Sequence, residues 1–167
     1  MAKSNPVVRH RLDPAQQPRR TRLVIAEKTL NRFLAFDYGE KRIGVATGNL
    51  QLASTQALTI LNCQNEQPNW LEVEAIIKEW QVEAFVVGLP LNMDDSEQLI
   101  TQKAKKFGNR LHGRFGLPIF FHDERLSSAE VKEYLFEIGG YKKLQQDIDA
   151  YAAELILKSF FENLNKT

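Results

Sequence analysis

Hydrophobic and polar positions first follow a strand pattern in the main body of the chain. An apolar run over residues 33–36 ends at Asp37, a turn falls at Gly39, and a second apolar stretch covers residues 42–48. A third stretch of the same kind covers approximately residues 53–61. Because short turns join the three stretches, they predict an antiparallel meander of three strands.

Farther along the chain, strands alternate with helices. Asn69 followed by Glu72 is a capping-box pattern, and apolar residues recur at helical spacing from Leu71 to Trp80. The same signals predict a strand over residues 83–88, a helix over about 96–111, a strand over 117–122, a helix that begins at Ser127, and a final helix over about 147–164.

This order predicts an α/β fold with a five-stranded mixed sheet. The first three strands are antiparallel, helical crossovers lead to the fourth and fifth, and helices pack on the faces of the sheet. We expect residues 32–167 to form one domain, preceded by a basic, flexible N-terminal extension over residues 1–31. Ligands of open sheets bind at the carboxyl ends of the strands, so the residues that follow each strand are candidates for chemistry.

Composition limits the kinds of site and compartment. The chain has 167 residues, 43% of them hydrophobic, which is enough to build one domain around a core. Its single cysteine, Cys63, excludes an internal disulfide and an all-cysteine zinc site, and it favours a reducing compartment. The sequence has no run of about 18 apolar residues and no apolar core of signal-peptide type, so we expect a cytoplasmic protein without membrane association.

Charge is distributed unevenly along the chain. Residues 1–32 hold eight Lys and Arg against two acidic residues, whereas the remainder holds fourteen against nineteen. A basic arm can contact nucleic acid electrostatically, but a solvated tail has the same composition, and both interpretations stay open.

Acidic residues follow or flank the predicted elements at several places. Asp37 ends a strand that is apolar on both faces, where a carboxylate is costly unless a metal or hydrogen bonds hold it. Asp123 and Glu124 follow the fifth strand. Asp149 begins the apolar stripe of the last helix, whereas Asp147 is accounted for by the helix macrodipole.

These carboxylates predict a metal-dependent phosphodiesterase. Carboxylates from three elements would repel one another if they were left bare, and Mg²⁺ prefers oxygen ligands. Two such ions can activate an attacking water and stabilise the leaving oxygen of a phosphodiester. A nuclease is therefore the natural function for such a set.

Five segments together carry a resemblance to a known family. Residues 37–46, 87–94, 123–128, 139–141 and 149–153 resemble, in order and spacing, the YqgF-type nucleases, which are relatives of the bacterial Holliday-junction resolvases. The resemblance implies an RNase H-like fold and a role in ribosome biogenesis, with processing of the 5′ end of pre-16S rRNA. Cleavage of branched DNA as a Holliday-junction resolvase is the alternative that it also implies.

The resemblance carries the family's acidic positions onto Asp37, Glu124 and Asp149, which would bind Mg²⁺ or Mn²⁺. Asp123 is the neighbouring acid of the same motif and a further candidate ligand. The sequence departs from the family pattern at Asp95, where a small, glycine-like residue is expected, and at Asp147, which competes with Asp149 for the assignment.

Basic and aromatic residues near these acids are candidates for binding nucleic acid. Lys41, Arg42 and Arg125 each adjoin a proposed ligand, where a cation can hold a phosphate or neutralise the acidic cluster. Tyr141 and Lys142 combine a stacking ring and a charge on one loop.

Two rival functions share these sequence features. The phosphate loop of actin-like and sugar-kinase-like ATP-binding domains also follows a strand with an Asp and two later glycines, but those proteins need a second domain. A non-catalytic RNA-binding assembly factor would keep the shape of a nuclease without turnover. The sequence leaves open RNA against DNA as substrate, endonuclease against exonuclease action, and a monomer against a homodimer.

Overall fold

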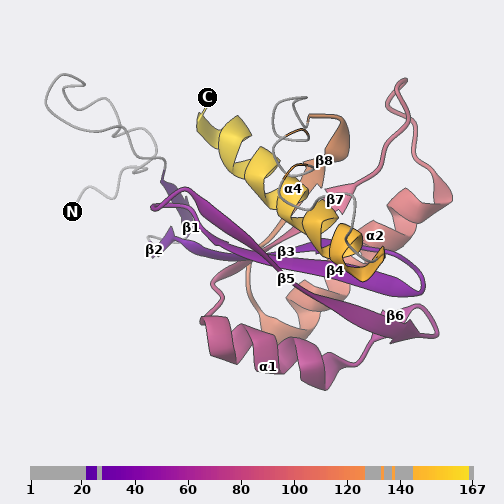
Figure 1. The fold of residues 1–167 in the computed structure, drawn as a ribbon, viewed down its shortest axis with the longest axis horizontal. Helices are drawn as coiled ribbons and strands as arrows, with labels where there is room; N and C mark the ends of the chain where they lie inside the picture. Colours follow the sequence, from indigo (N-terminus) through magenta and orange to yellow (C-terminus); the bar gives the residue numbers. More distant parts are fainter. Residues whose placement is uncertain (1–21, 26–27, 127–132, 134–136, 138–144, 166–167) are drawn as a thin grey trace, which may run out of the picture.

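The computed structural model describes residues 22–25, 28–126, 133, 137 and 145–165. A six-stranded sheet runs in the order β6-β5-β4-β3-β7-β8 (Figure 1). Strands β3, β4 and β5 are antiparallel neighbours, whereas β3, β7 and β8 run parallel. The strands of this sheet are β3 (Arg32–Asp37), β4 (Arg42–Asn49), β5 (Ser54–Gln64), β6 (Gln67–Pro68), β7 (Ala84–Leu89) and β8 (Ile119–Asp123).

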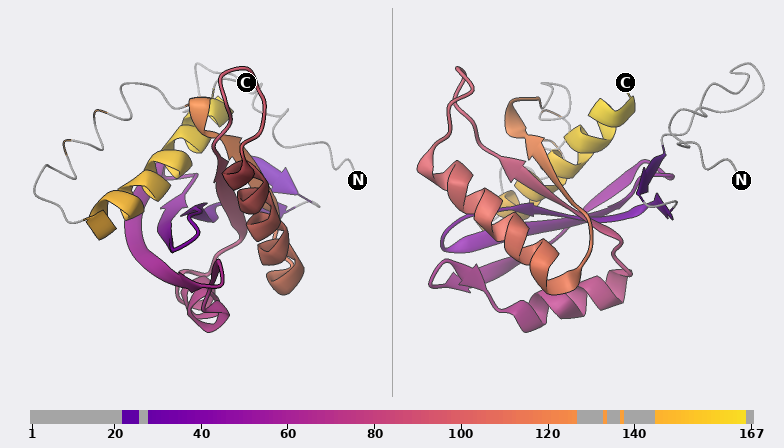
Figure 2. Two further views of the ribbon diagram at one scale, coloured as in Figure 1. Left: turned by 90° about the vertical axis from the view of Figure 1, so that its right-hand side faces the viewer. Right: turned by 180° about the vertical axis from the view of Figure 1, so that it is seen from behind.

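Helices cover both faces of the sheet. Helix α4 (Gln145–Asn165) crosses one face, and α1 (Trp70–Trp80) and α2 (Leu99–Phe115) lie on the other (Figures 1 and 2). A short 3-10 helix, η2 (Glu124–Leu126), follows β8 directly. No helix in the described ranges is long and apolar enough to cross a membrane.

The α/β class, the meander and the mixed sheet predicted from the sequence are confirmed. The sheet has six strands instead of five, because Gln67–Pro68 adds a short edge strand that is too brief to leave a periodic signal. Helix α2 begins at Leu99, three residues later than expected, because an isolated bridge between Leu91 and Glu97 keeps the preceding loop extended. Of the helix predicted from Ser127, only Glu133 and Glu137 are among the described residues, and both are helical.

Part of the N-terminal segment forms a hairpin. Strands β1 (Leu23–Ile25) and β2 (Lys28–Leu30) pair with each other in a separate two-stranded sheet. Leu30 is buried beneath α4 in the same cluster as Phe33, so the described end of this segment packs on the domain. The basic cluster before it lies outside the described residues.

Alternation along the strands divides the core into two layers. In β3, Leu34 and Phe36 pack with the cluster under α1 and α2, whereas Phe33 and Ala35 pack with α4. The strand is apolar at every interior position because both of its faces are covered. Asp37 follows Ala35 at a period of two and therefore belongs to the α4 face.

Two polar contacts fasten α4 to opposite sides of the sheet. The hydroxyl of Thr55 on β5 donates to the Glu154 carboxylate of α4 at 2.8 Å. On β8, His122 Nε2 lies 2.9 Å from the Ser159 hydroxyl of α4. Burial lowers the pKa of His122, although the charge of Asp123 opposes that effect. The neutral imidazole is thus a packing residue of the α4 layer.

A buried carboxylate joins the beginning of β3 to that of β7. Glu83 is 9% exposed, and its Oε1 accepts hydrogen bonds from the backbone amides of Asn31 and Arg32, both at 3.0 Å. Burial alone would raise the pKa of Glu83, but the two amides together with the cations of Arg32 and Lys28 hold that pKa below its usual range.

Replacement of Glu83 by Gln should lower the free energy of unfolding by about 1–2 kcal/mol at pH 7, because a charge-assisted contact is lost. The depressed pKa means that this stabilisation is present above the unfolded-state pKa and disappears as the pH falls through the folded-state value. Urea unfolding at pH 7 and at about pH 3 should therefore show a larger difference at pH 7 than at pH 3. Glu74→Gln, which removes the exposed pair with Lys78, is the control and should change little. Equal effects of both substitutions would contradict this role of Glu83.

Candidate functional site

The candidate site begins with a row of directly paired residues across three strands. Asp37 at the end of β3 pairs with Gly44 of β4, and Gly44 pairs with Ile60 of β5. Directly paired residues point to the same face of a sheet, and this face is the one beneath α4. Asp37 therefore lies at the carboxyl end of the central strand β3, under the first turns of that helix.

Gly44 brings Asp149 to this row. A Cβ atom at Gly44 would lie only 2.0 Å from the backbone carbonyl oxygen of Asp149. Only a residue without a side chain permits this approach of helix to strand. The glycine thus places the amino-terminal part of α4 directly beside Asp37.

Gly88 has the same role for the third carboxylate. It lies at the end of β7, and a Cβ atom there would lie 2.9 Å from Glu124 Oε2 and 2.5 Å from Ile156 Cδ1. The Glu124 side chain therefore passes over β7 toward α4 and Asp37. The three acids that the family resemblance selected meet on one face of the sheet.

The two other acids affect the pKa of Asp37. Burial, followed by the charges of Glu124 and Asp149, raises the pKa of Asp37 to about 7. Burial also raises the pKa of Glu124, with the charge of Asp123 as a second cause. Within the described residues no side chain donates a hydrogen bond to Asp37 that would offset these effects. A site of this kind gains free energy when it binds a cation.

Arg42 already supplies a positive charge to one of the acids. Its Nε donates to Asp149 Oδ2 at 3.0 Å, and both side chains are partly exposed. Arg42 lies at the start of β4 on the same face as Gly44, two residues away, so the pairing follows from the strand period. In this state the guanidinium neutralises Asp149.

Asp123 and Glu124 are neighbours in sequence but face opposite sides of the sheet. His122 packs against Ser159 on the α4 side, so Asp123 points to the other side, and Glu124 returns to the α4 side. Asp123 is taken up by Arg125, whose Nε and Nη2 donate to its carboxylate at 2.6–3.1 Å. These hydrogen bonds hold the pKa of Asp123 below its usual range.

Arg125 connects the end of β8 to the loop after β7. Besides Asp123, its Nη1 donates to the Asn92 carbonyl at 2.7 Å, and its Nη2 lies 2.7 Å from Asp95 Oδ1. Asp95 has a φ of 72°, a left-handed conformation that favours glycine and explains why a small residue is expected there. An aspartate is less suited to this backbone conformation than a glycine, but Asp95 forms an ion pair with Arg125 that a glycine could not form.

The remaining predicted residues do not join this cluster in the described structure. Lys41 is exposed in the turn between β3 and β4. Tyr141 and Lys142 lie outside the described residues, as does the side chain of Asp147. Among the described side chains, no three His, Cys, Asp or Glu residues are positioned closely enough to hold a metal ion as they stand.

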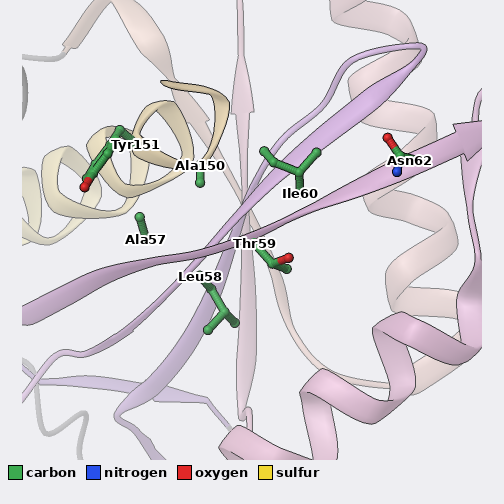
Figure 3. Close-up of a pocket in the computed structure, with 7 residues that line it drawn as sticks. All are labelled: Ala57, Leu58, Thr59, Ile60, Asn62, Ala150 and Tyr151. Atoms are coloured by element: carbon green, nitrogen blue, oxygen red, sulfur yellow. The ribbon is translucent and has the colours of Figure 1, made fainter. Parts of the chain in front are cut away.

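A pocket beside the acids was not anticipated from the sequence. It has a volume of about 440 Å³ and lies between β5 and the start of α4, as Figure 3 shows. Its lining residues are Ala57, Leu58, Thr59, Ile60, Asn62, Ala150 and Tyr151. The β5 residues carry no motif, so only the pairing of β5 with β4 connects them to Asp37.

Comparisons with known proteins agree with this geometry. The family model named RuvX, described as Holliday junction resolvase, matches residues 31–163. A protein of Shewanella denitrificans named "Putative pre-16S rRNA nuclease" is 55% identical over 137 residues, which are 81% of this chain and 97% of that protein. A protein of Haemophilus ducreyi with the same name is 53% identical over 131 residues, which are 78% of this chain and 95% of that protein.

Solved structures with the same fold come from more distant proteins. The RuvC structure of Thermus thermophilus superimposes with a TM-score of 0.54 at 15% identity and covers 81% of this chain and 97% of its own. T. thermophilus RuvC in complex with a Holliday junction substrate gives a TM-score of 0.54 at 13% identity, over 80% of this chain and 94% of that one. At these identities the similarity establishes a shared fold, which is RNase H-like.

Substitution of Gly44 by Ala should displace α4, because the new Cβ would overlap the Asp149 carbonyl. We expect a loss of about 2–3 kcal/mol in the free energy of unfolding, the range of overpacked cores, with any metal-dependent activity lost in parallel. Gly113→Ala is the matched control, since nothing lies within 4 Å of a Cβ there. That helical position should gain about 0.5–1 kcal/mol in the same urea titration. A Gly44 variant as stable as the wild type would refute the close approach.

Replacement of Asp37 by Asn should stabilise the protein in a chelator at alkaline pH. The folded-state pKa of about 7 lies well above the ordinary range of an aspartate, so the favourable contribution of the protonated acid is lost as the pH rises through about 7. At pH 8 the variant should melt roughly 3–6 °C higher than the wild type, and at pH 5 the gap should shrink. Thermal unfolding in EDTA measures both values. A gap that is constant with pH would show that Asp37 does not titrate in this range.

Proposed function

Because the chain belongs to the RuvX family, described as Holliday junction resolvase, we propose that it is a nuclease that hydrolyses phosphodiester bonds with Mg²⁺ or Mn²⁺. We further propose that its substrate is the 5′ end of pre-16S rRNA in the cytoplasm, during ribosome biogenesis. The names of the relatives that are 50–55% identical support this substrate.

One observation carries the metal-dependent reaction. The half-buried Asp37 has no donor among the described side chains, and the charges of Glu124 and Asp149 act on it. Like charges held together in a low-dielectric site destabilise the fold, and a divalent cation offsets that cost. All three side chains present oxygen, the ligand that magnesium and manganese prefer.

Each residue has a distinct part in the proposed reaction. Asp37, Glu124 and Asp149 would hold the metal, which when bound supplies an activated water and stabilises the leaving oxygen. Lys41 and Arg42 would contact the phosphate backbone beside the acids. Asp123 is left out of the ligand set, because Arg125 occupies it on the opposite face. Arg125 would instead hold the loop after β7 in place.

Branched DNA is the second candidate substrate. The description of the family model names a Holliday junction resolvase, and a structural relative was solved with a junction substrate. Resolution of a junction requires two cuts and therefore a homodimer, whereas a single-site RNA nuclease can act as a monomer. The third candidate, a non-catalytic RNA-binding assembly factor, predicts binding without turnover.

Cleavage assays should compare three substrates in parallel: a pre-16S rRNA 5′ precursor, a four-way DNA junction and a simple single strand. Each is incubated with magnesium, with manganese and with a chelator. The proposal expects cleavage of the rRNA precursor that depends on the metal. Cleavage of the junction alone would establish the resolvase, and binding without cleavage of any substrate would establish the assembly factor.

Variants of the acidic residues test the proposed ligand set. Asp37→Asn and Glu124→Gln should each slow cleavage at least about 100-fold, since each removes a charge that holds the metal. Asp123→Asn is the control within the same motif and should keep most of the wild-type rate. Loss of activity in all three variants would place Asp123 in the site, and full activity of Asp37→Asn would refute the proposal.

A further inference from the structure

The pocket between β5 and α4 adjoins the acidic cluster. Ile60 in its floor pairs with Gly44, which pairs in turn with Asp37. At one end of the pocket, Asn62 pairs with Arg42, and in its wall Ala150 directly follows Asp149. The pocket and the carboxylates therefore share one face of the sheet, and the contact between Gly44 and the Asp149 backbone lies between them.

The lining is mostly polar and includes an aromatic ring and an amide. In Figure 3, Ala57, Ile60 and Asn62 lie on the side of β5 that faces α4, whereas Leu58 and Thr59 point away from it. Tyr151 contributes an aromatic ring from the helix. Aromatic rings stack on the bases of unpaired nucleotides, and the amide of Asn62 can both donate and accept hydrogen bonds.

Size and access favour a single nucleotide over a duplex. The volume of about 440 Å³ lies in the usual range of sites for one small ligand. In the described part of the sheet, β6 pairs only with Cys63 and Gln64, so the outer edge of β5 beside the pocket has no strand partner. A nucleic-acid strand can enter from this edge without displacing any described element.

We propose that this pocket binds one unpaired base of the nucleic acid, next to the phosphate that lies at the carboxylates. The inference rests on the proposed nuclease function and adds a substrate preference to it. With a base in the pocket beside Tyr151, the sugar and phosphate continue toward Asn62 and Arg42. The protein then selects positions where a nucleotide has left the helical stack.

Binding to RNA duplexes that differ at one nucleotide tests this selection. Three fluorescein-labelled duplexes are compared by fluorescence anisotropy in EDTA, where metal-dependent cleavage does not occur. The first has one unpaired nucleotide, the second is fully paired, and the third carries an abasic residue in place of the unpaired nucleotide. Because the flanking helices fix the position of the bulge, the strand cannot shift to hide the missing base.

The full-length wild type should bind the first duplex at least about fivefold more tightly than the other two, the low end of base–aromatic stacking. Tyr151→Ala should bind all three equally, and Tyr151→Phe should restore the preference. Ala57→Leu, which fills the pocket and keeps Tyr151 itself unchanged, should abolish the preference as well. Leu71→Ala, at an exposed position of α1, is the control and should behave as the wild type does.

Equal binding of the three duplexes by the wild type would overturn the inference, as would a preference that survives both Tyr151→Ala and Ala57→Leu. If Tyr151→Ala does not fold, the binding preference of Ala57→Leu alone tests the inference, and a preference that survives in this variant would overturn it. The same proteins are then assayed for cleavage. A preference for the unpaired base without cleavage supports the pocket and refutes the nuclease, whereas cleavage without the preference refutes the pocket alone.

Discussion

The direct contact of α4 with β4 is the constraint on which the site depends. A helix normally lies on a sheet through a layer of side chains, but at Gly44 the Asp149 carbonyl sits where a Cβ atom would be. Two further contacts set the direction of the helix across the face. Glu154 of α4 contacts Thr55 of β5, and Ser159 of α4 contacts His122 of β8. Asp149 therefore reaches the end of β3 because the backbone of β4 leaves room for it.

A conflict of charge and burial follows from this packing. Burial already disfavours the ionised form of Asp37, and the negative charges of Glu124 and Asp149 disfavour it further. Together they raise the pKa of Asp37. Arg42 relieves part of it through its ion pair with Asp149. A divalent cation at the cluster and a phosphate at Arg42 would each replace part of this internal neutralisation. The proposed chemistry is thus one way of resolving a strain in the metal-free protein.

Much of this architecture could be predicted from local sequence patterns. The apolar runs before Asp37 and His122 gave their strands, and Asn69 gave the N-cap of α1, whose side chain accepts from the Leu71 amide. The two-residue period could also have separated Asp123 from Glu124, since it assigns them to opposite faces. What local patterns do not contain are contacts between distant segments. The network of Arg125 with Asn92 and Asp95, the edge strand Gln67–Pro68 and the pocket on β5 all arise from tertiary packing.

The order of the elements has a consequence for how the protein folds. Arg42 and Asp149 are 107 positions apart, and α4 follows every strand of the sheet in the chain. Closing so long a loop is a slow, late step compared with pairing β3, β4 and β5 through short turns. The face formed by Phe33, Ala35 and Val86 stays uncovered until that step, so an incompletely folded chain is prone to aggregation. Burial of this face and delivery of the last carboxylate are one event, so under the proposed function a chain that has not finished folding would lack a complete site.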